Sequence, residues 1–139
     1  LDSGKENGAI YHKTLESLMS VSDVLSVCCP ASKETINLIN KKTISLLPDG
    51  AIVTNVARGD IVDDDALIEA LDSKKVSAVG LDVYKNEPKL NPGYLKHSRA
   101  FVLPHLGSAT FETRTAMANL AIDNISEFFE TGSCKNKVN

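Results

Sequence analysis

The sequence predicts an α/β fold with a doubly wound parallel sheet. Four runs rich in apolar and β-branched residues alternate with helix-like segments along the chain, at residues 24–28, 51–56, 76–83 and 100–103. Each run is almost continuously apolar, which is typical of parallel strands that are covered on both faces. Because strands that alternate with helices form parallel sheets through right-handed crossovers, we expect these four strands to be adjacent and parallel, with helices on both faces.

Three helices are predicted from capping residues and apolar spacing. Residues 14–19 begin with a threonine that can cap a helix, and residues 63–71 begin with three aspartates, which favour a helix N-terminus. Residues 110–131 form the longest predicted helix, which starts at Thr110 and stops at Gly132. A further short strand is expected at residues 9–11.

Length and composition limit the possible function classes. A chain of 139 residues is one domain's worth of sequence, and its net charge of −3 argues against nucleic acid as a partner. No apolar run approaches the length of a membrane span, no signal peptide is recognised, and the cysteines lack metal-binding spacing, so a cytoplasmic protein without a metal is expected. Cys28 and Cys29 are interpreted as small buried residues in a reducing compartment, and Cys134 as a surface thiol.

Reactive or charged residues follow three of the predicted strands. Arg58 follows the strand at 51–56, Asp82 and Glu87 lie at and beyond the end of the strand at 76–83, and His105 follows the strand at 100–103. The carboxyl ends of parallel strands meet at one edge of the sheet, where ligands bind. We therefore expect these four side chains on one rim.

These residue types suit chemistry on a small carboxylic acid. A guanidinium binds a carboxylate through two parallel hydrogen bonds, and an imidazole can act as general acid or base. A carboxylate bonded to an imidazole fixes its tautomer and favours its protonated form. Simpler interpretations stay open: Arg58 in a surface ion pair, Glu87 as a solvated loop charge and His105 as a structural residue. His12 and His97 are assigned to the surface, and the aspartates at 63–65 to the helix start.

Taken together, these stretches resemble the nucleotide-binding domain of the D-isomer-specific 2-hydroxyacid dehydrogenases. They occur in the family's order and cover nearly the whole chain: residues 22–24, 29–30, 34–35, 39–40, 55–59, 62–63, 66–71, 80–83, 87–88, 104–110 and 112–114. Residues 8–12, 14–18, 47–50 and 91–94 look most like the glyoxylate/hydroxypyruvate reductase and D-glycerate dehydrogenase branch.

The resemblance implies a role for each candidate residue. Arg58 would hold the substrate carboxylate, His105 would donate a proton as hydride arrives from the nicotinamide, and Glu87 would keep His105 protonated. Asp82 would hydrogen-bond the nicotinamide carboxamide. The cofactor, NAD or NADP, would also be bordered by Cys29, Pro30, Thr35, Val56, Ala57, Gly107 and Ser108, together with Arg58 and His105.

The implied reaction interconverts a small 2-oxo acid, such as glyoxylate or hydroxypyruvate, and the D-2-hydroxy acid in a homodimeric enzyme. A Gly-x-Gly-x-x-Gly motif does not occur in the sequence. Residues 1–139 are therefore expected to be the C-terminal part of the NAD(P)-binding domain, without its glycine-rich loop and without a substrate domain, and inactive or nearly so alone.

Two other families are compatible with the same candidate residues. The chain could belong to a dehydrogenase-like corepressor, which would also keep Arg58, Glu87 and His105. It could also belong to a formate dehydrogenase-like enzyme, in which glutamine usually replaces a residue such as Glu87. A missing neighbour of the strand at 24–28 would leave an open edge. The isolated chain is therefore expected to self-associate, or to be disordered near residues 1–8 and this strand.

Overall fold

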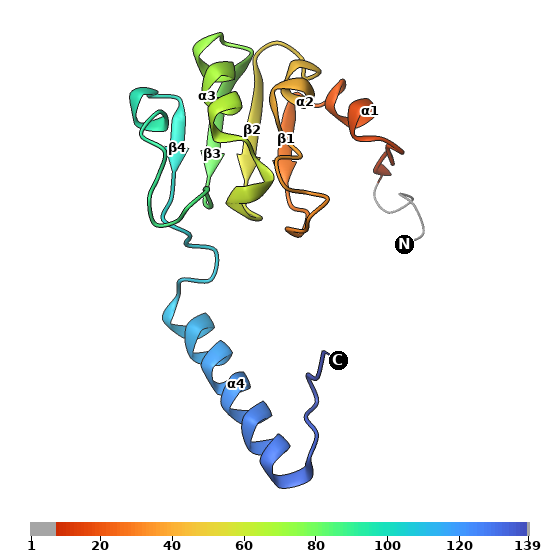
Figure 1. Cartoon of the computed structure of the whole chain (residues 1–139), viewed down its shortest axis with the longest axis vertical. Helices are drawn as coiled ribbons and strands as arrows, with labels where there is room; N and C mark the ends of the chain where they lie inside the picture. Colours follow the sequence, from red (N-terminus) through yellow and green to blue (C-terminus); the bar gives the residue numbers. More distant parts are fainter. Residues whose placement is uncertain (1–7, 139) are drawn as a thin grey trace. The chain divides into compact units, whose positions relative to one another are not determined.

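The computed structural model describes residues 8–138 and contains two compact units, the first ending at Pro104 and the second beginning at His105. The elements follow one another along the chain as strands alternating with helices (Figure 1): α1 (Leu15–Met19), β1 (Val24–Val27), α2 (Lys41–Ser45), β2 (Ala51–Asn55), η2 (Gly59–Ile61), α3 (Asp64–Asp72), β3 (Val76–Leu81), η3 (Tyr94–Lys96), β4 (Ala100–Val102) and α4 (Phe111–Thr131).

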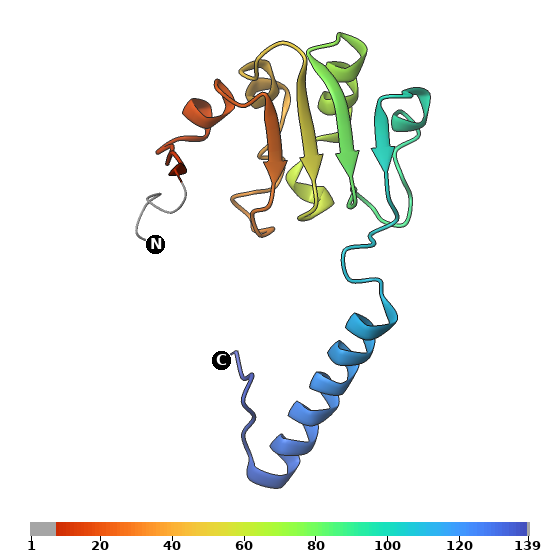
Figure 2. The same cartoon turned by 180° about the vertical axis from the view of Figure 1, so that it is seen from behind.

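The first unit contains a four-stranded parallel sheet with the order β1-β2-β3-β4. Leu25 pairs with Val53, Val53 with Val79, and Gly80 with Phe101. The predicted parallel sheet with flanking helices is therefore confirmed, and each strand is only one or two residues shorter than predicted. All four strands point their carboxyl ends toward the same edge, as the two opposite views show (Figures 1 and 2).

The core lies between the sheet and the layer that contains α2 and α3. Val53, Leu67, Leu71 and Val76 have no exposed surface, and the two views place these helices on one face of the sheet (Figures 1 and 2). On the other face, the side chains of Val24 and Phe101 are 61% and 66% exposed. The expectation of helices on both faces is thus not met within the first unit. Burial along β2 alternates with a period of two, as in a strand covered on one side.

The three predicted helices begin at residues whose side chains cap them. The Thr14 hydroxyl accepts a hydrogen bond from the Ser17 N–H, and the Asp63 carboxylate accepts one from the Ala66 N–H, each at 3.2 Å. Thr110 caps α4 in the same way, and Gly132 ends it with a φ of +76°. The predicted starts of all three helices and the predicted end of α4 are therefore confirmed.

Two local expectations need correction. The helix α2 was not anticipated, because its five residues carry too few apolar positions for a periodic pattern; a capping box between Asn40 and Thr43 defines its start. The short strand expected at residues 9–11 is wrong, since this segment has no regular structure and Ile10 and Tyr11 are exposed. Most of the segment 1–8, for which disorder was expected, lies outside the described residues.

The second unit consists of the segment that follows His105, the helix α4 and a short tail. None of the residues of α4 is buried, and Phe111, Met117, Leu120 and Phe128 are among its exposed apolar side chains. No helix in the part of the chain that the structure describes is long and apolar enough to cross a membrane. Self-association of the isolated chain stays a prediction.

Candidate active site

Arg58 is held at the carboxyl end of β2 by the buried side chain of Asn55. The Asn55 amide nitrogen donates to the Arg58 carbonyl at 2.9 Å, and its amide oxygen accepts from the Ala57 N–H at 3.0 Å. Asn55 is only 1% exposed. The side-chain amide of Asn55 thus uses both its nitrogen and its oxygen to close this turn. The backbone at Arg58 is therefore fixed, and the exposed Arg58 side chain extends from it.

The same residue connects this turn to the next strand. The Asn55 carbonyl accepts a hydrogen bond from the Asp82 N–H at 3.0 Å. Asp82 is half-buried and follows β3 directly. Asn55 therefore fixes both Arg58 and the backbone of Asp82, a role that the sequence reasoning missed. The available signal was a polar residue within an apolar run, two positions before Ala-Arg-Gly.

Gly59 brings the segment after β3 against the turn of Arg58. A Cβ atom at Gly59 would lie 2.1 Å from the carbonyl carbon of Tyr84 and 2.4 Å from the nitrogen of Lys85. Real Cβ atoms do not approach backbone so closely, so only glycine permits this contact. Two segments separated by more than twenty residues therefore meet next to Arg58.

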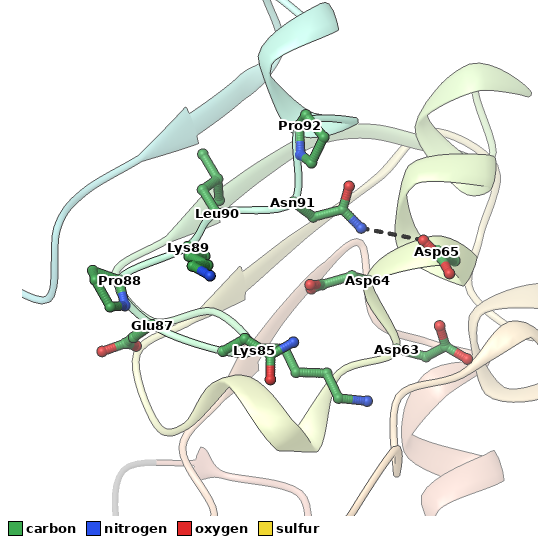
Figure 3. Close-up of a pocket in the computed structure, with 11 residues that line it drawn as sticks. Asp63, Asp64, Asp65, Lys85, Glu87, Pro88, Lys89, Leu90, Asn91 and Pro92 are labelled. Atoms are coloured by element: carbon green, nitrogen blue, oxygen red, sulfur yellow. Dashed lines mark hydrogen bonds between the residues drawn. The ribbon is translucent and has the colours of Figure 1, made fainter.

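Glu87 lies in the exposed turn that continues from Tyr84. Its carboxylate accepts a hydrogen bond from the Tyr84 N–H at 3.1 Å. Asn86 has a positive φ of 61°, a conformation that asparagine tolerates better than most residues, and the Glu87–Pro88 peptide bond is cis. Glu87 also borders an open, polar pocket of about 940 Å³ that is lined by residues 63–65 and 85–92 (Figure 3).

A second pocket of about 470 Å³ lies at the carboxyl ends of β1 and β2. Its lining consists of Cys28, Cys29, Pro30, Ala31, Ala57 and Arg58. Thr35 does not line this pocket, but its hydroxyl donates a hydrogen bond to the carbonyl of Pro30, which does, at 2.9 Å. Four of the residues that the resemblance implies for the cofactor (Cys29, Pro30, Ala57 and Arg58) thus surround one pocket, and Val56 lies exposed in the adjoining turn.

His105 begins the second unit and has an unusual backbone. Its φ is +55°, which a side chain with a Cβ rarely adopts and which is found often at functional sites. Two residues before it, the Leu103 N–H donates to the Leu81 carbonyl at 2.8 Å, so the chain leaves the sheet at the carboxyl end of β4. His105 and Gly107 are exposed and Ser108 is half-buried.

The remaining histidines, two of the cysteines and the aspartates at 63–65 are not among the candidate site residues predicted from the sequence. His97 is not a surface residue as expected: its side chain is 13% exposed and its Nε2 lies 3.3 Å from an oxygen of Asp72. His12 is half-buried beside Ser17. Cys28 is exposed rather than buried, and Cys134 is half-buried. The aspartates at 63–65 start α3, as expected.

Comparison with known proteins identifies the family to which the chain is similar. The model of the D-isomer specific 2-hydroxyacid dehydrogenase NAD-binding domain matches residues 2–107. Glycerate dehydrogenase of Hyphomicrobium methylovorum is 43% identical over 121 residues, which are 87% of this chain and 38% of that protein. Glyoxylate reductase 1 of Saccharomyces cerevisiae is 38% identical over 132 residues, which are 95% of this chain and 37% of that protein.

Solved structures of related enzymes are also similar to this chain. A glyoxylate reductase from Paecilomyes thermophila superposes with a TM-score of 0.88 at 40% identity, over 96% of this chain and 40% of that one. An NADPH-dependent glyoxylate/hydroxypyruvate reductase from Sinorhizobium meliloti, in complex with NADP and malonate, gives 0.89 at 35% identity, over 94% of this chain and 41% of that one. The chain thus spans about two fifths of the length of these relatives. On these matches, the chain belongs to the D-isomer-specific 2-hydroxyacid dehydrogenase family and contains sequence of its NAD-binding domain.

Proposed function

We propose that this chain supplies the catalytic edge of an NAD(P)-dependent enzyme that interconverts a small 2-oxo acid and the D-2-hydroxy acid. Glyoxylate or hydroxypyruvate is the proposed 2-oxo acid. Relatives named for these substrates support the proposal, as do the residues at the carboxyl ends of β1, β2 and β3. A homodimer and a cytoplasmic location rest on the family resemblance and belong to the same proposal.

The observation that carries the proposal is the joint construction of the Arg58 turn and the segment leading to Glu87. Asn55 closes the turn, and Gly59 seats the backbone of Tyr84 beside it. Arg58, which can bind a carboxylate, and Glu87, which can pair with an imidazole, thus come from two segments that pack against each other. An accidental surface arginine would not need such a construction.

The pocket beside Arg58 fits the nicotinamide end of the cofactor. Its wall is made of small and weakly polar groups, from Cys29, Pro30 and Ala57, with one guanidinium at the side. A flat, uncharged ring and a ribose suit such a wall, and Asp82 at the end of the neighbouring strand can accept from a carboxamide. When bound, the nicotinamide supplies or accepts the hydride.

The chain's own residues would do the remaining work. The Arg58 guanidinium binds the substrate carboxylate and orients the 2-oxo group, and preorganised charge of this kind stabilises the developing negative oxygen. His105 holds the proton that this oxygen receives, and Glu87 keeps the imidazole protonated. In the reverse direction, His105 takes the proton from the hydroxyl group.

The test is steady-state kinetics on the full-length protein. Oxidation of NADH and of NADPH is followed over a range of glyoxylate, hydroxypyruvate and pyruvate concentrations. Arg58→Lys keeps the charge but loses the paired hydrogen bonds, so kcat/KM should fall about 10²-fold. Lys42→Gln, an exposed cation on α2, is the control and should leave kcat/KM unchanged. If the wild-type protein oxidises neither cofactor with any 2-oxo acid, the proposed function is wrong.

A further inference from the structure

The exposed stretch that carries Glu87 lies between the buried side chain of Val83 and the partly buried side chain of Leu90. Residues 82–93, here called the Glu87 loop, connect β3 to η3, and residues 86–89 are all exposed. An exposed stretch of loop is mobile unless its two ends are fixed. One end is fixed where Tyr84 rests on Gly59. The position of Glu87 therefore also depends on what holds the other end.

Beyond Leu90, the other end of the loop is anchored by Tyr94, the first residue of η3. Its side chain is 1% exposed, and its hydroxyl donates a hydrogen bond to an oxygen of Asp64 at 2.9 Å. Asp64 belongs to the first turn of α3 and is half-buried. The buried ring and its hydrogen bond join the end of the loop to the start of a core helix.

Neighbouring contacts keep the loop in the same place. The Asn91 amide donates to Asp65 at 3.2 Å, as the dashed line in Figure 3 shows. The Asn91 oxygen accepts from the Gly93 N–H at 3.0 Å. A Cβ at Gly93 would lie 2.5 Å from the Cδ1 atom of Ile68, so this backbone packs directly on α3. The loop end is thus fitted to the first two turns of α3.

The surroundings of Tyr94 keep its hydroxyl protonated, so that it can donate the hydrogen bond to Asp64. Burial raises the pKa of the Tyr94 phenol well above its usual value, and the nearby Asp64 carboxylate raises it further, so Tyr94 remains a neutral donor. Besides Tyr94, the charged groups around Asp64 are Asp63, Asp65 and Lys85. In Figure 3 the three aspartates stand at the start of α3, across the pocket from the Glu87 loop.

We propose that Tyr94 and Asp64 are positioning residues. Their buried hydrogen bond holds the Glu87 loop and thereby keeps the Glu87 carboxylate in position for its proposed role of keeping His105 protonated. The catalytic meaning of this placement rests on the function proposed above. Neither residue is expected to touch the substrate, because Tyr94 is enclosed in the core of the first unit.

The experiment compares three variants of the full-length protein. Tyr94→Phe removes the hydroxyl and keeps the ring. Tyr11→Phe makes the same change at an exposed tyrosine, and Ile44→Val trims a buried side chain on α2 to control for a general loss of stability. Two quantities are measured: amide hydrogen exchange of residues 84–92, and the pH profile of kcat and KM for 2-oxo acid reduction.

We expect Tyr94→Phe to raise amide exchange in the Glu87 loop about fivefold, the effect of losing one buried hydrogen bond. It should also lower kcat and move the alkaline limb of the kcat profile to lower pH, with KM for the 2-oxo acid unchanged. Both control variants should leave the loop exchange and the alkaline limb in place. Unchanged exchange, or faster exchange with an unchanged kinetic profile, would overturn the proposal.

Failure of the proposed function gives a different result. In that case the wild-type protein reduces no 2-oxo acid, while amide exchange still decides whether the hydrogen bond holds the loop. Asp64→Asn adds a second decision, because the amide oxygen can still accept from Tyr94. It should keep the slow exchange that Tyr94→Phe loses. If Asp64→Asn and Tyr94→Phe raise exchange equally, the hydrogen bond to an oxygen acceptor is not what holds the loop.

Discussion

Gly59 and Tyr84 pack backbone against backbone, with space for no side chain between them. A Cβ added at Gly59 would lie 2.1 Å from the Tyr84 carbonyl carbon and 2.3 Å from its oxygen. Gly59 is adjacent to Arg58, and the Glu87 carboxylate accepts a hydrogen bond from the Tyr84 N–H. This contact therefore links the two parts of the candidate active site that lie in the first unit.

Gly59→Ala should destabilise the chain and separate these two parts. The added Cβ would meet rigid backbone atoms, so the loop itself must move, and overpacking of this kind costs about 1–3 kcal/mol. Urea unfolding of the chain measures the change. Gly80→Ala is the matched control in β3, since its Cβ would meet Thr54 at an ordinary 3.4 Å. Equal unfolding midpoints for the two variants would show that the contact at Gly59 is not tight.

Glu87→Gln should change the pH dependence of catalysis in the full-length protein. An anionic neighbour favours the protonated imidazole, and an amide of the same shape does not. The variant should therefore lose its proton donor earlier as the pH rises, and the alkaline limb for 2-oxo acid reduction should move down by about one pH unit or more. Glu16→Gln, an exposed change on α1, serves as the control. Superimposable profiles for Glu87→Gln and wild type would show that Glu87 does not act on the proton donor.

Asp64→Asn should alter the pH dependence of stability. Burial raises the pKa of Asp64 above its usual 3.8, against the opposing effect of the hydrogen bond from Tyr94. A carboxyl group with a raised pKa contributes most to stability below its unfolded pKa, and this contribution is lost as the pH rises through the folded value. The stability of wild type relative to Asp64→Asn should therefore fall between acidic and neutral pH. A constant or rising difference in urea unfolding would contradict this assignment.

The parallel sheet could be predicted because its signals are local. Apolar runs ended by polar or turn residues mark the strands, and Thr14, Asp63 and Thr110 mark the helix starts. The uncovered face of the sheet could not be predicted, since an apolar strand residue such as Val24 reads the same whether or not another layer covers it. The helix α2 is set by a capping box rather than by periodicity, and it escaped detection for that reason.

The sequence suggests the candidate reactive residues but not the contacts that support them. Arg58 and Glu87 follow strands, so topology alone brings them to one edge of the sheet. The supporting contacts are long-range: Gly59 with Tyr84, and Asp64 with Tyr94. A glycine or a tyrosine in the sequence does not identify its partner twenty-five or thirty residues away.

His105 is proposed to donate the proton in the reduction of a 2-oxo acid, and the kinetics of His105→Gln in the full-length protein reveal whether it does. The glutamine side chain can hydrogen-bond but cannot act as a general acid, so kcat should fall about 10²- to 10⁴-fold while the affinity for NADH or NADPH, measured by nucleotide fluorescence, stays the same. His12→Gln, at a half-buried histidine beside α1, should keep the wild-type kcat. A His105→Gln protein that reduces glyoxylate and hydroxypyruvate at the wild-type rate would show that His105 is not the proton donor.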